Sequence, residues 1–252
     1  MQRVLPVGGG RWLLTGIRFH GNEGFPFVDV VASSHPLDDP ARLKEALKAA
    51  HEAYQNFDPD AVRVFQSSDR PWDVPEGIEA TRDQVVVVGS LDELVGLPRV
   101  DNYDAVKLEP VESPERAAKF VEKTYDEFFA EHPRFEAILQ PTDSEDLAEC
   151  EETGALRYIE VDGERAGLLA TASEFGPLVS GQCVYEEILT TEFRGRNLAA
   201  AAQRHLIEHL AAARPEPLVH GTIDARNEPS RATARRVGRR EVAAWWWLRV
   251  ST

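Results

Sequence analysis

Apolar and polar positions form two kinds of pattern over the first 90 residues. Residues 12–19 and 25–32 are rich in apolar and β-branched side chains, and they predict two strands joined by the Gly- and Asn-containing residues 20–24. Residues 40–57 predict a helix, because apolar residues recur there with helical spacing. That stripe consists of Leu43, Leu47, Ala50 and Tyr54. Short strands are expected at residues 61–66 and 84–88, with a Pro- and Gly-containing loop between them.

A second pattern follows the linker-like residues 96–102. Strands are expected at residues 103–108, 156–161, 166–173, 183–190, 217–223 and 240–250. Four helices are expected. The first begins at Ser113-Pro114, and the second runs from a Thr142/Glu145 capping box to near Gly154. The third covers residues 196–212, and the fourth runs from an Asn227 cap to Val237, where Gly238 ends it. The apolar stripes are Ala117, Val121, Tyr125 and Phe128 on one helix, and Leu198, Ala202, Leu206 and Leu210 on another. Asp162-Gly163 predicts a tight hairpin turn.

The order of these elements, β-α-α-β-β-β-α-β-α-β, predicts a mixed sheet flanked by helices. The fold class is therefore α/β (α+β mixed sheet). We expect one domain at residues 1–98, which is a small α/β unit, and a second at residues 103–252.

Composition narrows the class of protein. The chain has 252 residues, of which 42% are hydrophobic and 28% charged, and this excludes a collagen, a coiled-coil rod, a disulfide scaffold and wholesale disorder. The net charge of −15 argues against nucleic acid as a partner. Apolar runs are far shorter than the roughly 20 residues of a membrane helix. We therefore expect no membrane partner. The two cysteines, Cys150 and Cys183, lack CxxC spacing, so we expect a cytoplasmic protein, and we expect no metal.

Positive charge is concentrated in one segment. Between Arg194 and Arg240 there are ten arginines and four acidic residues, which gives this segment a net charge of +6 and leaves −21 for the rest of the chain. An anionic ligand would explain such a segment, and a solvated helix face balanced by acids elsewhere would explain it equally well.

A turn between a strand and a helix is the strongest chemical signal. Residues 185–190 lead through Thr191-Glu192-Phe193 into Arg194-Gly195-Arg196-Asn197 and then a helix. The first turn of a helix has unpaired N–H groups and a partial positive charge, which favour an anion. Gly195 allows a close backbone approach, Asn197 tolerates left-handed geometry, and the two arginines supply charged donors for phosphate.

At these residues the sequence resembles the GNAT acyltransferase (N-acetyltransferase) superfamily. The phosphate-binding motif of that superfamily is Gln or Arg, two residues, Gly, one residue, and then Gly or Ala. Arg194, Asn197 and Ala199 match it with one departure, Asn197 in place of Gly. The hairpin at residues 159–167 and the segment from Asn227-Glu228-Pro229-Ser230 to Gly238 also resemble the family, and the resemblance covers about residues 103–252. The strand-strand-helix-strand order of residues 1–98 is compatible with a degenerate second GNAT half.

The resemblance implies acetyl-CoA, or another acyl-CoA, as co-substrate. Its pantetheine arm would pair with the backbone of Ile188, Leu189 and Thr190, where two parallel strands separate. Its pyrophosphate would bind the turn and the start of the helix, which consist of Arg194, Gly195, Arg196, Asn197, Leu198 and Ala199. Asn227 and Ser230 belong to the second motif helix, and Arg226, Arg231 and Arg235 are candidates for the 3′-phosphate.

Transfer to an amine needs a base, because a free alkyl amine is mostly protonated near neutral pH. Glu186 and Glu187 lie on the strand beside the expected thioester, and because neighbours on a strand face opposite ways, one of them reaches the site. We favour Glu187, since family members often draw a base from this strand. The family's usual acid is a tyrosine in the second motif helix, where this chain has Ala234, so Tyr185, Ser230 or water is the substitute. The charge of −21 favours a cationic small-molecule or peptide amine as acceptor.

Other interpretations remain at this point. His205-Leu206-Ile207-Glu208-His209 spells the H-x-x-E-H zinc-peptidase motif, but both histidines are expected on an exposed helix face. We expect His220 to be a strand residue without a special role and Trp245-Trp246-Trp247 to pack in the last strand. A non-catalytic acyl-CoA-binding sensor or interaction module is the main alternative function. The oligomeric state is open, with a homodimer as one option.

Overall fold

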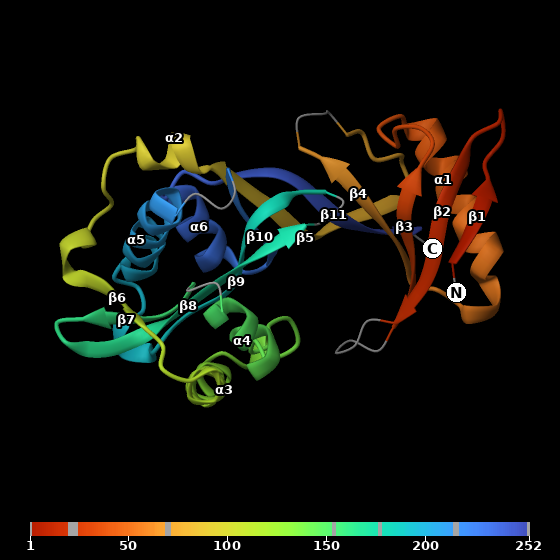
Figure 1. Ribbon diagram of the computed structural model, residues 1–252. Helices are drawn as coiled ribbons and strands as arrows, with labels where there is room; N and C mark the ends of the chain where they lie inside the picture. The colour runs from red at the N-terminus through yellow and green to blue at the C-terminus, as the bar shows by residue number, and fades with distance from the viewer. Residues whose placement is uncertain are drawn as a thin grey trace. The chain divides into compact units, whose positions relative to one another are not determined.

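The computed structural model describes residues 2–19, 25–68, 72–152, 155–175, 178–213 and 217–250 (Figure 1). The chain divides into two compact units. The first contains Met1–Val86, Asp224–Arg226 and Glu241–Thr252, and the second contains Val87–Ile223 and Asn227–Arg240. The boundary passes through strand β5 (Ile78–Ser90). The predicted domain division at residues 96–102 stays a prediction. In the packing, the last strand, β11 (Arg240–Val250), belongs to the first unit except for Arg240.

The first unit is a sheet with one helix. Its strands are β1 (Gln2–Pro6), β2 (Trp12–Phe19), β3 (Pro26–Ser33), β4 (Ala61–Ser67), β11 (Arg240–Val250) and the part of β5 up to Val86, in the order β1-β2-β3-β4-β11-β5. β3 and β4 are parallel, whereas β1 with β2, β2 with β3, and β4 with β11 are antiparallel. Helix α1 (Pro40–Tyr54) begins at Asp39, whose side chain accepts a hydrogen bond from the N–H of Arg42 (2.9 Å). The predicted stripe of α1 is buried in the core of this unit.

The three consecutive tryptophans of β11 pack inside the first unit, as expected. Trp247 is buried, and its ring meets that of Phe27 edge to face with centroids 4.7 Å apart. Trp245 and Trp247 lie on the same side of the strand, and the guanidinium of Arg63 lies 5.1 and 5.4 Å from their ring centroids. Arg63 also donates to the carboxylate of Asp83 (2.7 Å). These contacts give Trp245 and Trp247 partners within the first unit.

The second unit contains a sheet covered by helices on both faces. Its strands are β6 (Val106–Pro110), β7 (Leu156–Val161), β8 (Glu164–Phe175), β9 (Ser180–Leu189) and β10 (Leu218–Asp224), in the order β10-β9-β8-β7-β6. β9 and β10 are parallel and the other pairs in this series are antiparallel. The helices are α2 (Leu91–Val95), α3 (Pro114–Glu131), α4 (Ser144–Glu152), α5 (Leu198–Ala213) and α6 (Glu228–Arg236).

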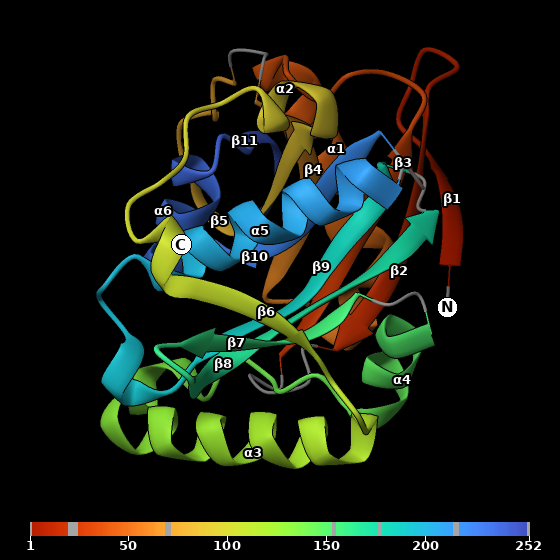
Figure 2. The same ribbon diagram turned by 60° about the vertical axis from the view of Figure 1, so that its left-hand side comes forward.

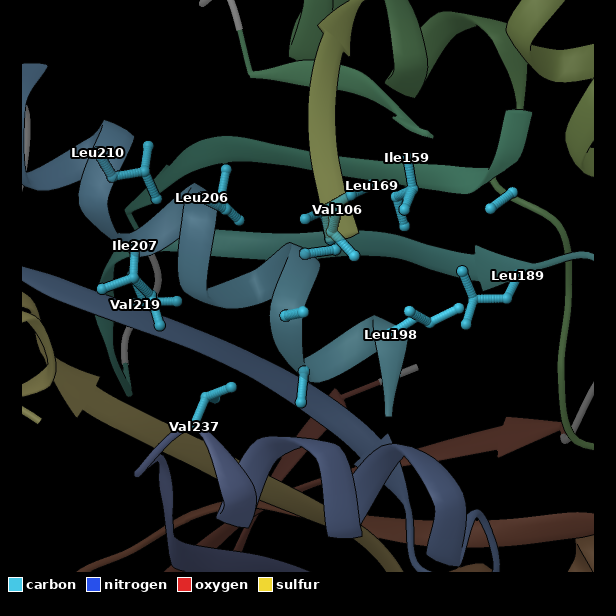
Figure 3. Close-up of a cluster of buried hydrophobic side chains, with 14 of the residues drawn as sticks. Val106, Ile159, Leu169, Leu189, Leu198, Leu206, Ile207, Leu210, Val219 and Val237 are labelled. Atoms are coloured by element: carbon cyan, nitrogen blue, oxygen red, sulfur yellow. The ribbon is translucent and has the colours of Figure 1, made fainter. Parts of the chain in front are cut away.

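Alternation along the strands builds a separate core on each face of this sheet. On β8, Leu169 packs toward α5, whereas Leu168 and Ala170 pack toward α3 and α4. Figure 2 shows α5 and α3 on opposite sides of the strands, and Figure 3 shows Leu206 and Leu210 of α5 in the cluster that contains Leu169. In the described part of the chain, every helix is too short or too polar to cross a bilayer.

The predicted element order of residues 103–252 is confirmed, and most boundaries hold to within a few residues. The bounds predicted for β2, β7 and β11 match the observed ones. Asp162 and Gly163 have φ values of 54° and 82°, as a tight two-residue hairpin turn requires. Asn227 caps α6 by accepting from the N–H of Ser230 (3.3 Å). The loop expected at residues 20–24 and the helix end expected near Gly154 lie outside the described residues.

Several local predictions were wrong. Tyr103–Ala105 forms a 3₁₀ turn before β6, because the Tyr103 ring packs on α5 instead of extending the strand. α4 is capped by Asp143, whose carboxylate accepts from the N–H groups of Glu145 and Asp146 (2.9 and 3.0 Å), and Thr142 bonds to β9 instead. α5 begins at Leu198, two residues later than predicted. β1 and α2 were not predicted, and β5 begins at Ile78, six residues earlier than expected.

The residues expected to be a linker are tied to α5 by a buried arginine. The Arg204 side chain is 3% exposed and donates to the carbonyl oxygens of Leu94, Val95 and Leu97, the last two at 2.7 Å. The Leu94 carbonyl also accepts from the N–H of Leu97 (3.1 Å), and Val95 and Leu97 are 41% and 42% exposed. One side chain therefore links α5 to three carbonyls at and just after the end of α2.

We expect Arg204→Met to lower the free energy of unfolding by about 1.5–3 kcal/mol, because three carbonyl oxygens lose hydrogen bonds from a charged donor. Urea unfolding followed by circular dichroism measures this. Arg116, whose side chain is 78% exposed in an ion pair with Glu112, provides the control. Arg116→Met is expected to change stability by less than about 1 kcal/mol, and equal effects of the two substitutions would contradict the role of Arg204.

Candidate functional site

The turn between β9 and α5 has the backbone geometry that the sequence predicted. After a 3₁₀ turn at Thr191–Phe193, Gly195 and Asn197 have φ values of 73° and 60°, and α5 begins at Leu198. A Cβ built on Gly195 meets nothing within 4 Å, so glycine is required there by the left-handed φ and not by lack of space. The departure from the family motif at residue 197 thus keeps the conformation that glycine would have, because asparagine also adopts it.

The Arg194 side chain points back into the protein and braces this turn. Its Nε donates to the carbonyl of Leu189 (2.8 Å), one terminal nitrogen donates to Thr191 Oγ1 (3.3 Å), and the guanidinium lies over the ring of Phe128 (4.5 Å). Arg194 also lies 3.9 Å from a carboxylate oxygen of Glu131. Burial lowers the pKa of Arg194. Arg194 therefore shapes the turn, and its second terminal nitrogen is buried without a hydrogen-bond partner. The phosphate contacts expected of Arg194 and Arg196 stay predictions.

Arg196 presents an exposed cation at the same turn. Its guanidinium lies 5.6 Å from the ring centroid of Phe193, and its carbonyl oxygen accepts a hydrogen bond from the side chain of Asn102 (2.8 Å). Asn102 itself has a left-handed φ of 61°. The N–H groups of Leu198 and Ala199 lie in the first turn of α5, where a helix provides them with no acceptor. The turn thus combines backbone donors, a helix dipole and a free arginine.

β9 separates from β10 soon after the two strands meet. The parallel pairing is confined to Gln182 with Val219 and Cys183 with His220, whereas pairing with β8 continues to Leu189. The edge of β9 that faces β10 is therefore open from Val184 onward, through Ile188 and Leu189. An extended ligand can add to such an edge as a strand does. Thr190 is bonded on the β8 side, where its N–H donates to Ala166 (2.9 Å).

A β-bulge on β9 sets the directions of the three catalytic candidates. Ala170 pairs with Glu186 and Thr171 with Val184, which leaves Tyr185 as the extra residue. Tyr185 and Glu186 both pack toward α3 and α4, whereas Glu187 points toward α5. The expectation that Glu186 and Glu187 face opposite ways is confirmed.

Glu186 is a buried, fully bonded carboxylate. It is 4% exposed and accepts from the hydroxyl of Tyr125 (3.1 Å) and from the N–H groups of Thr142 (3.1 Å) and Glu187 (3.0 Å). Burial raises its pKa although these donors oppose the shift. With its donors in place, Glu186 anchors β9 to α3 and to the segment before α4.

Glu187 has a pKa suited to proton transfer near neutral pH. Burial raises the pKa of Glu187 to about 7, while the charge of Arg239 and a hydrogen bond from Gln203 act against the rise. Oε2 accepts from Gln203 (2.7 Å), and Oε1 is buried with no hydrogen-bond partner. Arg239 is 3% exposed and donates to the other end of the Gln203 amide (2.8 Å), while its Nε and one terminal nitrogen have no partner. Arg239 also lies close to β10. One of its terminal nitrogens is 3.6 Å from the point where a side chain on Gly221 would begin, and Gly221 is the first β10 residue beyond the parallel pairing.

The second motif helix has a structural cap and paired arginines. Asn227 and Ser230 bond to each other at the start of α6. The terminal nitrogens of Arg231 and Arg235 contact the carboxylate of Glu228, the first at 3.1 Å. Arg226 is paired with Asp224 (2.9 Å). Ala234 is fully buried, so a tyrosine does not fit at this position without a shift of its surroundings.

The H-x-x-E-H residues have other partners. His205 stacks on Tyr103 with ring centroids 3.9 Å apart, and its Nε2 lies 2.9 Å from the Tyr103 carbonyl oxygen. Glu208 accepts from the Tyr103 hydroxyl. The expectation of an exposed face therefore holds for His209 and is wrong for His205, which is partly buried by the Tyr103 ring. A hollow of about 420 Å³ lies elsewhere, between β6, the start of α3 and Arg165, and none of the predicted site residues lines it.

Comparison with known proteins identifies the fold. No family model matches the chain, and no curated protein sequence matches it either. An acetyltransferase of the GNAT family from Colwellia psychrerythraea gives a TM-score of 0.57 at 10% identity, over 96% of this chain and 83% of that one. A GCN5-related N-acetyltransferase from Sphaerobacter thermophilus gives 0.54 at 13% identity, over 95% and 76%. A tandem GNAT protein from the clavulanic acid biosynthesis pathway gives 0.51 at 15% identity, over 97% and 81%.

These likenesses show that the chain has the GNAT fold, and they confirm the resemblance found in the sequence at the level of fold. They extend over the N-terminal residues as well, including in the match to a tandem protein.

The anchoring of Glu186 predicts a pH-dependent effect. We expect Tyr125→Phe to lower the free energy of unfolding by about 1.5–3 kcal/mol at about pH 8, because a buried ionised carboxylate loses a donor. The raised pKa of Glu186 means that its ionised form is disfavoured in the fold, so this loss shrinks as pH falls and the group becomes protonated. Chemical denaturation of the wild type and the variant at several pH values measures the loss of stability and its dependence on pH.

Tyr54→Phe is the matched control for this experiment. The buried Tyr54 hydroxyl lies 3.1 Å from Thr15 Oγ1, a neutral partner, so its loss is expected to be independent of pH. A Tyr125→Phe effect that does not change with pH would contradict the assignment of Glu186 as its charged partner.

Proposed function

We propose that this protein is an acetyl-CoA-dependent N-acetyltransferase that acts on a primary amine. The observation that carries the proposal is the turn at Gly195–Asn197, which combines left-handed backbone, the N-terminus of α5 and an exposed Arg196 beside the open edge of β9. This combination suits a ligand that has both a diphosphate and an extended amide-containing arm. The GNAT fold supports acetyl-CoA as that ligand.

In this proposal, acetyl-CoA binds along the edge of β9 and ends at the turn. Its pyrophosphate accepts hydrogen bonds from the first N–H groups of α5 and a charged contact from Arg196. Its pantetheine arm pairs with the backbone near Ile188, in the space left where β10 separates. The hydrogen bond from Arg194 to the Leu189 carbonyl holds the turn in position at the end of β9.

Glu187 is proposed as the general base. A neutral amine attacks the thioester carbonyl, its proton passes to Glu187 directly or through water, and the C–S bond breaks to give an amide and the CoA thiol. A carboxylate with a pKa of about 7 is ionised in part at neutral pH and basic enough to accept a proton. Gln203 and Arg239 hold Glu187 in place and limit how far burial raises its pKa.

A water molecule is proposed to protonate the leaving thiolate in place of the residue missing at Ala234, because Tyr185 packs toward α3 and α4, on the face of the sheet opposite to Glu187. Tyr185 affects the site through its surroundings instead. It lies on the bulge of β9, is partly exposed, and burial together with nearby acidic groups raises its pKa to about 12. Such a phenol stays protonated at neutral pH. The acids that act on it include Glu174, Glu149 and Asp146, and this negative field supports a cationic amine as acceptor.

The binding site is tested by separating the two arginines of the turn. We expect Arg196→Ala to weaken CoA binding about tenfold, as loss of one charged contact to phosphate would, without a change in thermal stability. We expect Arg194→Ala to weaken binding and also lower the melting temperature, because it removes the brace on Leu189. Calorimetric titration with CoA and thermal unfolding measure these effects. Unchanged affinity in both variants would contradict the site.

The base is tested by its pH dependence. We expect kcat of the wild type to fall about tenfold per pH unit below about pH 7, because protonated Glu187 cannot accept a proton. We expect Glu187→Gln to lower kcat by about 10²–10⁴-fold and to remove this acidic limb. Glu186→Gln is the comparison, and if it removes the limb while Glu187→Gln keeps it, the assignment is wrong.

A non-catalytic acyl-CoA-binding module is the second candidate, because buried Ala234 occupies the place of the usual acid. The affinity for acetyl-CoA and steady-state acetyl transfer to a panel of primary amines distinguish the two. Binding without turnover over the panel favours the sensor.

A further inference from the structure

Three side chains with metal-binding atoms meet on one face of the second unit's sheet. Glu174 lies on β8, Cys183 on β9 and His220 on β10, and one carboxylate oxygen, the thiol sulfur and one ring nitrogen all lie within 4.8 Å of one another. None of these residues was predicted to act together, since they are far apart in the sequence. A search of the described residues for three or more His, Cys, Asp or Glu side chains close enough to share one ion finds this group.

The sheet register places the three side chains together. His220 is the parallel partner of Cys183, and Ala172 is the antiparallel partner of Cys183 on the other side. Glu174 is two residues from Ala172 and therefore faces the same way. Gly181, the partner of Glu174, has no side chain that would separate the carboxylate from the thiol. The cluster thus follows from pairing that is fixed by the backbone.

His220 supplies an independent sign that the cluster lacks a partner. Its side chain is 6% exposed, and its Nε2 is buried with no hydrogen-bond partner. An imidazole nitrogen buried in this way is costly unless it meets a donor or a metal. Burial lowers the pKa of His220, so the ring is neutral near pH 7, the form that binds metal.

We propose that Glu174, Cys183 and His220 form a binding site for a zinc-like divalent transition-metal ion. A thiolate, an imidazole and a carboxylate are ligands that zinc accepts together, with a water molecule in the fourth position. The partial exposure of Cys183 and Glu174 gives an ion access from solvent.

Charge balance is compatible with the site. Binding of the ion displaces the thiol proton to solvent, so thiolate and carboxylate supply two negative charges against the two positive charges of the ion. Without metal, burial and the contact with Glu174 raise the pKa of Cys183 and keep it protonated. The positive charge of Arg239 favours the thiolate but opposes the cation, so the affinity reflects both effects.

The location gives the ion a structural task. Cys183 and His220 form the last residue pair before β9 and β10 separate. An ion held by Glu174, Cys183 and His220 would join three adjacent strands at that point and hold the two strands together where the open edge begins. This structural role of the ion is independent of acyl transfer.

The site is tested with cobalt(II) added to the full-length chain after treatment with a chelator. We expect one equivalent to bind and to give a thiolate-to-cobalt charge-transfer absorption that zinc abolishes on addition. We expect Cys183→Ser to lose the absorption, and Glu174→Gln or His220→Gln to weaken the affinity by at least about tenfold. Absence of the absorption in the wild type, or its persistence in Cys183→Ser, would overturn the proposal.

Matched controls make the result specific. Cys150→Ser replaces the other cysteine, which forms no disulfide and whose sulfur is outside the cluster, and His209→Gln replaces an exposed histidine on α5. Both variants are expected to keep the absorption and the affinity of the wild type. Glu174 is partly exposed and outside the buried core, so Glu174→Gln tests the site with little disturbance of packing. Zinc is expected to raise the melting temperature of the wild type more than that of this variant. Equal shifts in the two proteins would count against the site.

Discussion

The early separation of β9 from β10 is the constraint on which the second unit depends. Two parallel residue pairs fix the start of the strands, and the antiparallel pairing with β8 then carries β9 alone to Leu189. An open strand edge inside a protein is unfavourable, because its N–H and C=O groups need partners. Arg194 satisfies the last carbonyl of that edge, and the bulge at Tyr185 changes the direction of the side chains along it. The open edge, the turn and the acidic side chains are thus consequences of one local divergence.

Burial of charge next to this edge opposes stability. Glu187 and Arg239 are linked only through the amide of Gln203, and several of their polar atoms have no partner. A core built for stability alone would close such a gap with a direct ion pair or apolar side chains. Glu186, by contrast, accepts three hydrogen bonds. Glu187, the next residue on the strand, has one carboxylate oxygen without a hydrogen-bond partner. That contrast between adjacent carboxylates supports an anchoring role for Glu186 and the proposed reactive role of Glu187.

The sequence predicted the parts of this structure that local chemistry determines. The element order after residue 103, the Asp162-Gly163 turn, the Asn227 cap and the left-handed Asn197 all follow from properties of single residues or short patterns. The facing of Glu186 and Glu187 followed from strand alternation. The inward direction of Arg194 did not, because a turn motif does not show which carbonyl an arginine will find. Sequence periodicity also does not show how distant segments pair. The bulge at Tyr185 and the contact of Cys183 with His220 depend on the register between strands. The hydrogen bonds that link Glu187 to Arg239 through Gln203 depend on how α5 packs on the sheet.

All five tryptophans of the chain, Trp12, Trp72 and Trp245–Trp247, belong to the first unit, whereas four of the five tyrosines lie in the second. Indole emission therefore reports almost entirely on one of the two units, and it is silent about the strands and helices that surround the β9–α5 turn. A fluorescence melt and a far-ultraviolet melt of the same sample would coincide only if both units unfold in one cooperative step. The distribution of a single amino-acid type thus provides an intrinsic, label-free way to tell whether these two cores melt together or in succession.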